Sequence, residues 1–232
     1  LGGKGLFTQE IEDGLLDKSI DIAVHSMKDM PTVLPDGLLI DCILERVDPR
    51  DAFLSFKAGS LAELPEGAVV GTSSLRRAAQ VKLRRPDIEI VPFRGNVDTR
   101  LAKLKSGDVA ATFLAFAGLK RLGLDNDISE IMNVEDMLSA IAQGAIGLQT
   151  RQDDVQTRSI LQPINDRTTQ IAITLERAFR EVLEGDCRTP IAGLAQLAET
   201  EPLIFRGQVL LPDGSDMREV TRMDIISGDG LA

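Results

Sequence analysis

The chain has 232 residues, of which 43% are hydrophobic and 27% are charged, and its formal net charge at pH 7 is −10. This composition is typical of a globular protein, and the length allows one large domain or two to three small ones. The negative charge argues against nucleic-acid or membrane-surface binding, because both require a basic surface. No apolar run approaches the roughly 18 to 20 residues of a membrane span, and no signal-peptide pattern opens the chain, so we expect a cytoplasmic protein.

Two cysteines, Cys42 and Cys187, are too few for a disulfide framework, and together with the single histidine they are too few for a structural zinc site. We therefore expect no metal site, and any thiol chemistry would use one cysteine. The first residue is Leu1 and not methionine, which predicts a fragment or a processed product.

The N-terminal part predicts a helix followed by a strand. Residues 5–19 place Phe7, Ile11 and Leu15 at helical spacing behind a Thr8 cap, and IDIAVHS (20–26) alternates like a strand. HSMKDMP (25–31) is then the loop that leaves the strand. Ligands of open α/β sheets bind at the carboxyl ends of strands, so this loop is a candidate site.

The middle of the chain alternates between strands and helices. Strands are predicted at 38–44, 51–55, 68–72, 88–93 and 109–118, with helices at 73–83, 97–107 and 119–124. VDPRD (47–51) holds turn-forming and charged residues that suit a crossing between domains. The alternation predicts a mostly parallel α/β sheet.

The last third predicts a smaller α+β unit. QGAIGLQT (143–150) is a candidate strand returning to the first domain, and residues 166–185 form a long amphipathic helix stopped by Gly185. A strand at 189–197 and a hairpin at 201–223, turning at PDG, complete the unit.

Two turns between strands and helices carry arginines. GTSSLRR (71–77) combines helix-start N–H groups with hydroxyls, a combination that binds anions, although a capped helix alone would explain it. Arginines in a first turn oppose the helix dipole by roughly 0.3 to 1 kcal/mol, a cost that a bound anion reverses. FRGNVDTR (93–100) repeats the arrangement. Guanidinium groups bind carboxylates bidentately, so the two turns predict a ligand with several carboxylates.

His25 raises the question of a nucleophilic triad with Asp29 and a cysteine. The strand alternation instead favours a hydrogen-bonded structural histidine. Asp29 and Lys28 alone would suit an exposed surface pair of little energetic weight. Cys42 fits a buried apolar strand, whereas Cys187 lies in a polar loop, which is less typical of a free cysteine.

Five motifs, taken in order, closely resemble the porphobilinogen deaminase (hydroxymethylbilane synthase) family, and the match covers essentially the whole chain. They are HSMKDMP, GTSSLRR, FRGNVDTR, AGLKRLG (117–123) and EGDCRTPIAG (184–193). The resemblance implies two periplasmic-binding-protein-like, mostly parallel α/β domains plus a small α+β C-terminal domain. It places domain 1 at 1–46 and 144–163, domain 2 at 47–143 and domain 3 at 164–232.

The family resemblance also implies an activity. The enzyme would be a transferase of porphyrin, haem and chlorophyll biosynthesis that deaminates four porphobilinogen molecules and joins them into linear hydroxymethylbilane. The chain would grow on a dipyrromethane cofactor attached by thioether to Cys187. Asp29 matches the catalytic aspartate, which would stabilise the cation left by loss of ammonia.

The resemblance assigns further residues to binding. Those that would hold the cofactor are Lys28, Ser74, Arg76, Arg77 and Arg100. Those that would meet the substrate or the growing chain are Arg94, Arg121, Lys4, Phe7 and Gln143. We expect a monomer with a small-molecule substrate, in the cytoplasm or, in a photosynthetic eukaryote, the plastid.

The sequence departs from the family at both ends, because an N-terminal strand and helix and a final C-terminal helix are not present in it. Two alternatives compete with the family reading. A two-domain anion-binding receptor would use the same arginines but has no need of Cys187. A Cys–His–Asp hydrolase would need His25 at the reacting centre, which the predicted structural position of His25 argues against.

Overall fold

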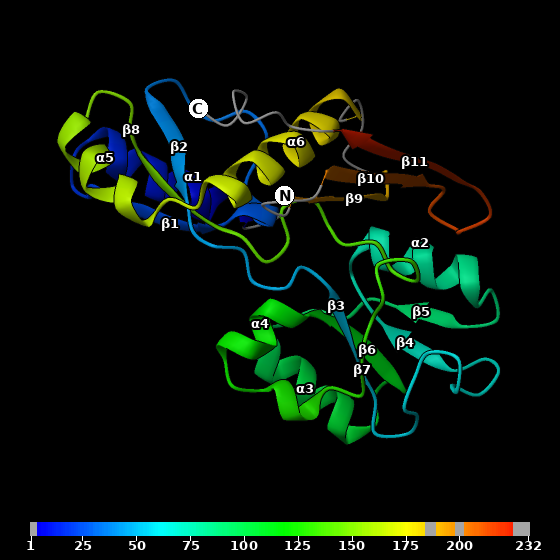
Figure 1. The fold of residues 1–232 in the computed structure, drawn as a ribbon. Helices are drawn as coiled ribbons and strands as arrows, with labels where there is room; N and C mark the ends of the chain where they lie inside the picture. The colour runs from blue at the N-terminus through cyan, green and yellow to red at the C-terminus, as the bar shows by residue number, and fades with distance from the viewer. Residues whose placement is uncertain (1–3, 184–188, 198–201, 225–232) are drawn as a thin grey trace.

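The computed structural model describes residues 4–183, 189–197 and 202–224. Its strands form three sheets, and helices pack on them (Figure 1). The strands are β1 (Ala23–Ser26), β2 (Leu38–Ile43), β3 (Asp51–Leu54), β4 (Val69–Gly71), β5 (Glu89–Val91), β6 (Ala111–Ala115), β7 (Glu130–Ile131), β8 (Ile146–Arg151), β9 (Ile191–Gln196), β10 (Leu203–Leu210) and β11 (Met217–Asp224). The α-helices are α1 (Lys4–Leu16), α2 (Leu75–Arg84), α3 (Val97–Ser106), α4 (Phe116–Arg121), α5 (Val155–Leu161) and α6 (Arg167–Leu183).

The first sheet has the order β1-β8-β2, and both of its pairings are antiparallel. Its central strand, β8, comes from the part of the chain that follows the whole five-stranded sheet. The segment after β2 crosses to that second sheet, and the segment before β8 returns from it. The predicted strand at 143–150 is therefore confirmed as a return to the first sheet.

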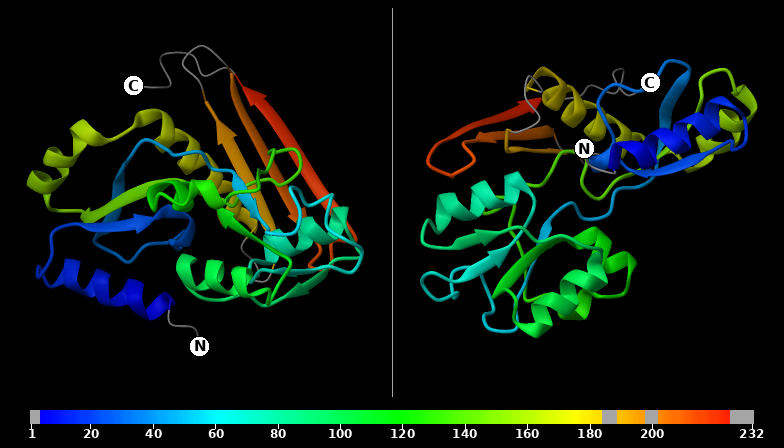
Figure 2. Two further views of the ribbon diagram at one scale, coloured as in Figure 1. Left: turned by 90° about the horizontal axis from the view of Figure 1, so that it is seen from below. Right: turned by 180° about the vertical axis from the view of Figure 1, so that it is seen from behind.

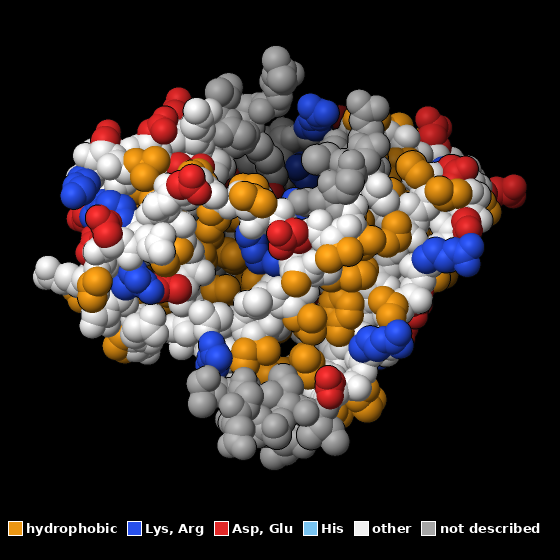
Figure 3. All heavy atoms as spheres, turned by 90° about the horizontal axis from the view of Figure 1, so that it is seen from above, with side chains coloured by type: hydrophobic (Ala, Val, Ile, Leu, Met, Phe, Trp, Pro, Cys, Tyr) orange, Lys and Arg blue, Asp and Glu red, His pale blue; other side chains and the backbone are white. Residues whose placement is uncertain are grey.

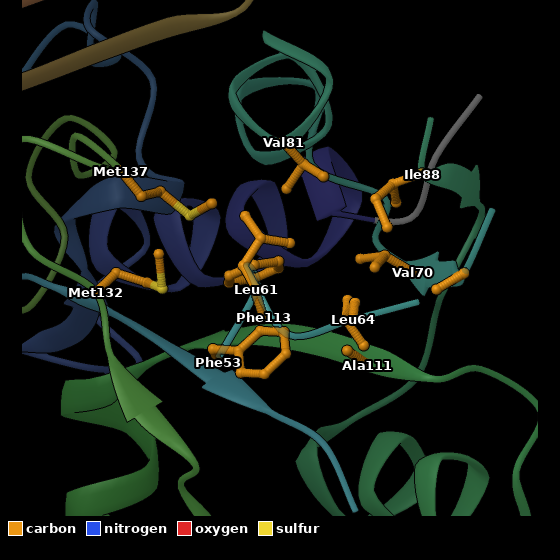
Figure 4. Packing of buried hydrophobic residues seen from close by; sticks show 11 residues of the cluster. Phe53, Leu61, Leu64, Val70, Val81, Ile88, Ala111, Phe113, Met132 and Met137 are labelled. Carbon is orange, nitrogen blue, oxygen red and sulfur yellow. The ribbon is translucent and has the colours of Figure 1, made fainter. Parts of the chain in front are cut away.

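The second sheet has the order β5-β4-β6-β3-β7. β4 pairs in parallel with β5 and with β6, whereas β3 is antiparallel to β6. Side chains alternate between two apolar layers. Phe53 and Phe113 pack with Val81 of α2 on one face, with their ring centroids 5.4 Å apart (Figure 4). Leu54 and Leu114 pack on the other face, against Leu104 of α3 and Leu119 of α4.

The third sheet is an antiparallel meander in the order β11-β10-β9, covered by α6. The ring of Phe179 lies against Gly207, where a Cβ would come within 2.6 Å of it, so only glycine fits there. The turn between β10 and β11 reaches α2 of the second sheet (Figures 1 and 2). At that turn Gly214 approaches the α2 backbone, and a Cβ would lie 2.5 Å from the nitrogen of Leu83.

The α/β class with a small C-terminal α+β unit is confirmed. Among the described strands, the predicted mostly parallel pairing is limited to β4 with β5 and β6, because the first sheet is antiparallel. β7 and α5 were not predicted, and several element boundaries differ from the predictions. α1 begins at Lys4, so Thr8 lies inside the helix and does not cap it. The predicted strand at 109–118 ends at Ala115, and α4 begins at Phe116. Apolar residues continue across that junction, so hydrophobicity alone gives no boundary there. No described helix is long and apolar enough to cross a membrane.

A buried ion pair lies where the chain passes between the first two sheets. We call residues 44–50 the outgoing crossing and residues 132–145 the returning crossing. Arg46 Nη1 lies 2.6 Å from Oε1 of Glu176, which has no solvent exposure. The same carboxylate accepts backbone hydrogen bonds from Ala142 at 2.6 Å and Ala195 at 2.8 Å. One side chain of α6 thus contacts the outgoing crossing, the returning crossing and the third sheet.

Replacing Glu176 with glutamine is expected to destabilise the protein by roughly 3 to 5 kcal/mol, because it leaves the Arg46 charge buried without its partner. The free energy of unfolding would be measured in denaturant. Glu135→Gln is the control, because Glu135 pairs with Arg206 at the surface and its side chain is 64% exposed. Loss of an exposed pair costs about 0 to 1 kcal/mol. Equal losses in both variants would contradict the role of Glu176.

Candidate functional site

The turn between β4 and α2 is built by hydroxyl groups. Ser74 is the N-cap of α2, and its Oγ accepts a hydrogen bond from the backbone nitrogen of Arg77 at 3.4 Å. Oγ1 of Thr72 accepts from the nitrogen of Ser74 at 3.1 Å. The two arginines that follow are 5% and 6% exposed. The helix cap is therefore present, and both guanidinium groups point into the protein.

Both arginines bind one buried carboxylate, that of Asp51. Arg76 Nη1 lies 2.7 Å from Oδ2 and Arg77 Nη2 lies 2.7 Å from Oδ1. Arg77 Nε also donates to Oδ1, at 3.1 Å. Further N–H groups donate to main-chain oxygens of Leu138 and Phe113, each at 2.7 Å. Two guanidinium groups around one carboxylate leave the cluster with net positive charge.

The strand direction explains why Asp51 is at this edge of the sheet. β3 runs antiparallel to β6, and its first residue lies opposite Ala115, the last residue of β6. The start of β3 therefore lies beside the carboxyl ends of the parallel strands, where α2 begins. Burial alone would raise the pKa of Asp51, but the charges of Arg76 and Arg77 outweigh it and hold the pKa well below its usual range.

Lys28 and Asp29 belong to the 3₁₀ turn Met27–Asp29, which directly follows β1. Lys28 is half-buried and Asp29 is exposed. Burial and the charge of Arg77 lower the pKa of Lys28 to about 8, while Asp29 and Asp51 oppose that shift. Lys28 of the first sheet thus lies within electrostatic range of α2 of the second. Figure 3 shows Lys and Arg side chains recessed near the middle of one face, bordered by hydrophobic groups.

The second arginine turn lies beside the first. Asn96 caps α3 by accepting from the nitrogen of Thr99 at 2.8 Å, and Arg100 Nε donates to the oxygen of Gly95 at 2.8 Å. Burial and the nearby charge of Arg77 lower the pKa of Arg100. Arg94 is exposed at the start of the same turn. The two predicted arginine turns are therefore neighbours in the fold.

Arg121 and Gln143 lie at the crossings between the first two sheets. Arg121 is exposed, and its Nη2 donates to the oxygen of Gly144 at 3.0 Å. Gln143 is 1% exposed, and its Nε2 donates to the oxygen of Pro49 at 2.6 Å and to Oδ1 of Asp51 at 3.0 Å. In this structure Gln143 acts on the arginine cluster through Asp51.

His25 is a hydrogen-bonded structural residue, as the strand pattern predicts. It is 8% exposed, and its Nε2 lies 2.8 Å from Oε1 of Gln149, whose amide nitrogen donates to Glu12 at 3.1 Å. Cys42 is buried, and its Sγ donates to the oxygen of Leu161 at 3.4 Å. Burial raises the pKa of the Cys42 thiol. These contacts argue against a Cys–His–Asp hydrolase built on Cys42.

The structure describes three of the predicted site residues only in part or not at all. Cys187 lies in the segment between α6 and β9, which is outside the described residues. Lys4 and Phe7 belong to α1, but the structure does not describe their side chains. Their assignments remain predictions.

The main residue that the sequence reasoning missed is Asp51. A signal for it exists in DAFL (51–54), since a carboxylate begins a strand in which every residue is buried. A buried carboxylate requires positively charged or hydrogen-bonding partners. The identity of those partners, 25 and 26 positions later in the chain, cannot be read from local spacing.

Comparisons with known proteins identify the family of the chain. Residues 1–159 match the family model "Porphobilinogen deaminase, dipyromethane cofactor binding domain", and residues 170–228 match "Porphobilinogen deaminase, C-terminal domain". The porphobilinogen deaminase of Paracoccus denitrificans is 56% identical over the whole chain, which spans 74% of that protein. The chloroplastic porphobilinogen deaminase of Oryza sativa subsp. japonica is 52% identical over 96% of the chain, and the match spans 62% of its length.

Among solved structures, the methionine-binding protein MetQ is 17% identical and has a TM-score of 0.45, over 75% of this chain and 79% of that one. A score at this level supports no conclusion about ligand or activity. The two family models and the two relatives together settle the classification: this chain belongs to the porphobilinogen deaminase family.

Proposed function

We propose that this protein is a hydroxymethylbilane synthase, a transferase that deaminates four porphobilinogen molecules and joins them head to tail into the linear tetrapyrrole. The observation that carries the proposal is the cluster of Arg76, Arg77 and Lys28 around Asp51, next to the exposed carboxylate of Asp29. Every pyrrole unit of the substrate bears an acetate and a propionate. A largely buried cluster with net positive charge suits such a polycarboxylate.

The residues at α2 fit a carboxylate-bearing cofactor. The Nε atom of Arg76 is buried and has no hydrogen-bond partner among the described residues. An unpaired buried donor is costly unless a ligand satisfies it, and a carboxylate is the matching acceptor for guanidinium. We assign Lys28, Ser74, Arg76, Arg77 and Arg100 to the cofactor. Dipyrromethane, when bound through Cys187, supplies the primer to which pyrrole units are added.

Asp29 is the proposed catalytic residue. Loss of ammonia from the aminomethyl group of porphobilinogen leaves a cation delocalised over the pyrrole ring. A fixed carboxylate near the pyrrole N–H stabilises that charge as it develops in the transition state. The exposure of Asp29, beside recessed Lys28, suits a group that must reach successive substrate molecules. Arg94 and Arg121, and by resemblance Lys4 and Phe7, are assigned to the substrate or the growing chain. Gln143, which the resemblance also assigns to the substrate, is 1% exposed and would act on it indirectly, through its hydrogen bond to Asp51.

The proposal includes the organisation and setting of the protein. Domain 1 comprises residues 1–46 and 144–163, domain 2 residues 47–143, and domain 3 residues 164–232. The three sheets support this division, because each is built within one of these ranges. We propose a monomer that acts in the cytoplasm, or in the plastid of a photosynthetic eukaryote, with neither nucleic acid nor membrane as partner.

The direct test is the intact mass of the purified full-length protein, followed by an assay with porphobilinogen. We expect a mass above that of the polypeptide by one covalent dipyrromethane, and formation of hydroxymethylbilane. An anion-binding receptor would bind carboxylates with an unmodified mass and no product. That second pattern would refute the proposed function.

A further inference from the structure

Asp51 is the shared partner of both α2 arginines. Its Oδ1 accepts from Arg77 Nη2 and Nε and from Gln143 Nε2, and its Oδ2 faces Arg76 Nη1. The carboxylate is fully buried. It is therefore placed to orient the guanidinium groups and not to contact a ligand itself.

Orientation matters because arginine is otherwise a long and flexible side chain. Two adjacent guanidinium groups repel each other, and ordering each long side chain costs conformational entropy. Asp51 offsets both effects before any ligand arrives. Gln143 in turn fixes Asp51 to the outgoing crossing, because its amide also binds the oxygen of Pro49.

We infer that Asp51 is a positioning residue for the reaction: it holds the guanidinium groups of Arg76 and Arg77 in the orientation in which they receive the carboxylates of the cofactor and the growing chain. The inference rests on the proposed function, and it assigns Asp51 an indirect role, through the arginines.

If the Asp51 charge is removed, charge balance and side-chain orientation predict opposite changes in the affinity for substrate. Removing one negative charge from the cluster strengthens its attraction for a polycarboxylate, so charge alone predicts a lower KM. Loss of orientation predicts a higher KM, because the donors no longer converge on the ligand. The sign of the change in KM therefore distinguishes the two effects.

Lys28 provides a readout that is independent of turnover. The charged groups acting on it are Asp29 of its own turn, Asp51 at the start of β3, and Arg76 and Arg77 of α2. Burial and the two arginines lower the pKa of Lys28, and the negative charge of Asp51 opposes that shift. The net result is a pKa of about 8. Removing the Asp51 charge lowers that pKa further, so Lys28 loses its proton at a lower pH.

The test is Asp51→Asn in the full-length protein, which keeps the side-chain shape and removes the charge. We expect KM for porphobilinogen to rise on the order of tenfold, the effect of losing one charge-assisted contact of about 1.4 kcal/mol. The titration of Lys28, followed by NMR after reductive ¹³C-methylation and assigned with Lys28→Arg, should move to lower pH. Asp154→Asn is the matched control, because Asp154 caps α5 and pairs with Arg151 at 2.6 Å, away from the cluster.

A second variant covers the case in which Asp51→Asn does not fold. Gln143→Leu keeps every charge of the cluster and removes one donor to Asp51, so a smaller rise in KM is expected, with the Lys28 titration unchanged. An unchanged or lower KM in a folded Asp51 variant, or in Gln143→Leu if that variant alone folds, would overturn the inference. Such a result would leave the proposed function standing, since only an inactive, unmodified wild-type protein refutes it.

Discussion

Replacing Cys187 with serine is expected to abolish the covalent dipyrromethane adduct and, with it, tetrapyrrole synthesis. A thioether requires a thiolate nucleophile, and a serine hydroxyl is not ionised near neutral pH. The residue lies between the end of α6 at Leu183 and the start of β9 at Ile191. The intact mass of the purified variant would equal that of the bare polypeptide.

Cys42→Ser is the matched control for that experiment. The Cys42 thiol is buried and donates to the oxygen of Leu161, a bond that a serine hydroxyl can also make. We therefore expect the adduct and the activity to persist. An adduct that survives in Cys187→Ser, or disappears only in Cys42→Ser, would reassign the attachment point.

Changing Asp29 to asparagine is expected to lower kcat on the order of 100-fold or more while KM changes less. Asparagine keeps the shape of the side chain and loses the charge that stabilises the cationic transition state. Because Asp29 is exposed, the fold should tolerate the change. Hydroxymethylbilane formation would be measured in a full-length protein that carries its cofactor.

His25→Asn provides the comparison, since both residues belong to the same seven-residue motif. His25 is buried against Gln149, so its replacement should cost stability, about 1 to 3 kcal/mol, and spare most of kcat. Thermal unfolding would be recorded beside the rates. If a folded, cofactor-loaded His25 variant lost more kcat than Asp29→Asn, then His25 and not Asp29 would be the catalytic residue of this motif.

Local sequence patterns predict much of the second sheet and of α6. The strand and helix at 68–83 appear as β4 and α2, because an apolar run ends in a glycine and a capping serine. The amphipathic pattern at 166–185 appears as α6. In each case the signal lies within the element itself.

The pairing of strands is less predictable, because it depends on segments far apart in the chain. All pairings of the first sheet are antiparallel, since β8 returns from the second sheet in the direction opposite to β1 and β2. Sequence alternation indicates that 143–150 is a strand but not which strands flank it. The parallel pairs of the molecule's described part are confined to the second sheet.

The chemistry of the site was predicted in part. Hydroxyls and arginines at the start of α2 indicate an anion site, but the sequence does not show that Arg77 also neutralises a buried carboxylate. Because of that contact, replacing Arg77 with leucine would leave Asp51 with one fewer cation, and it would reduce the stability of the fold as well as ligand binding. The proximity of Lys28 to α2 likewise depends on how the two sheets are joined.

The central position of β8 has a consequence for synthesis on the ribosome. β1 and β2 are both hydrogen-bonded to β8, which lies between them, so their sheet lacks its middle strand until residue 151 has emerged. The five-stranded sheet needs only residues 51–131 and can form earlier. At roughly 5 to 20 residues per second, the N-terminal strands wait many seconds for their partner. During that interval the nascent chain exposes apolar strand surface, which is the kind of segment that chaperones bind.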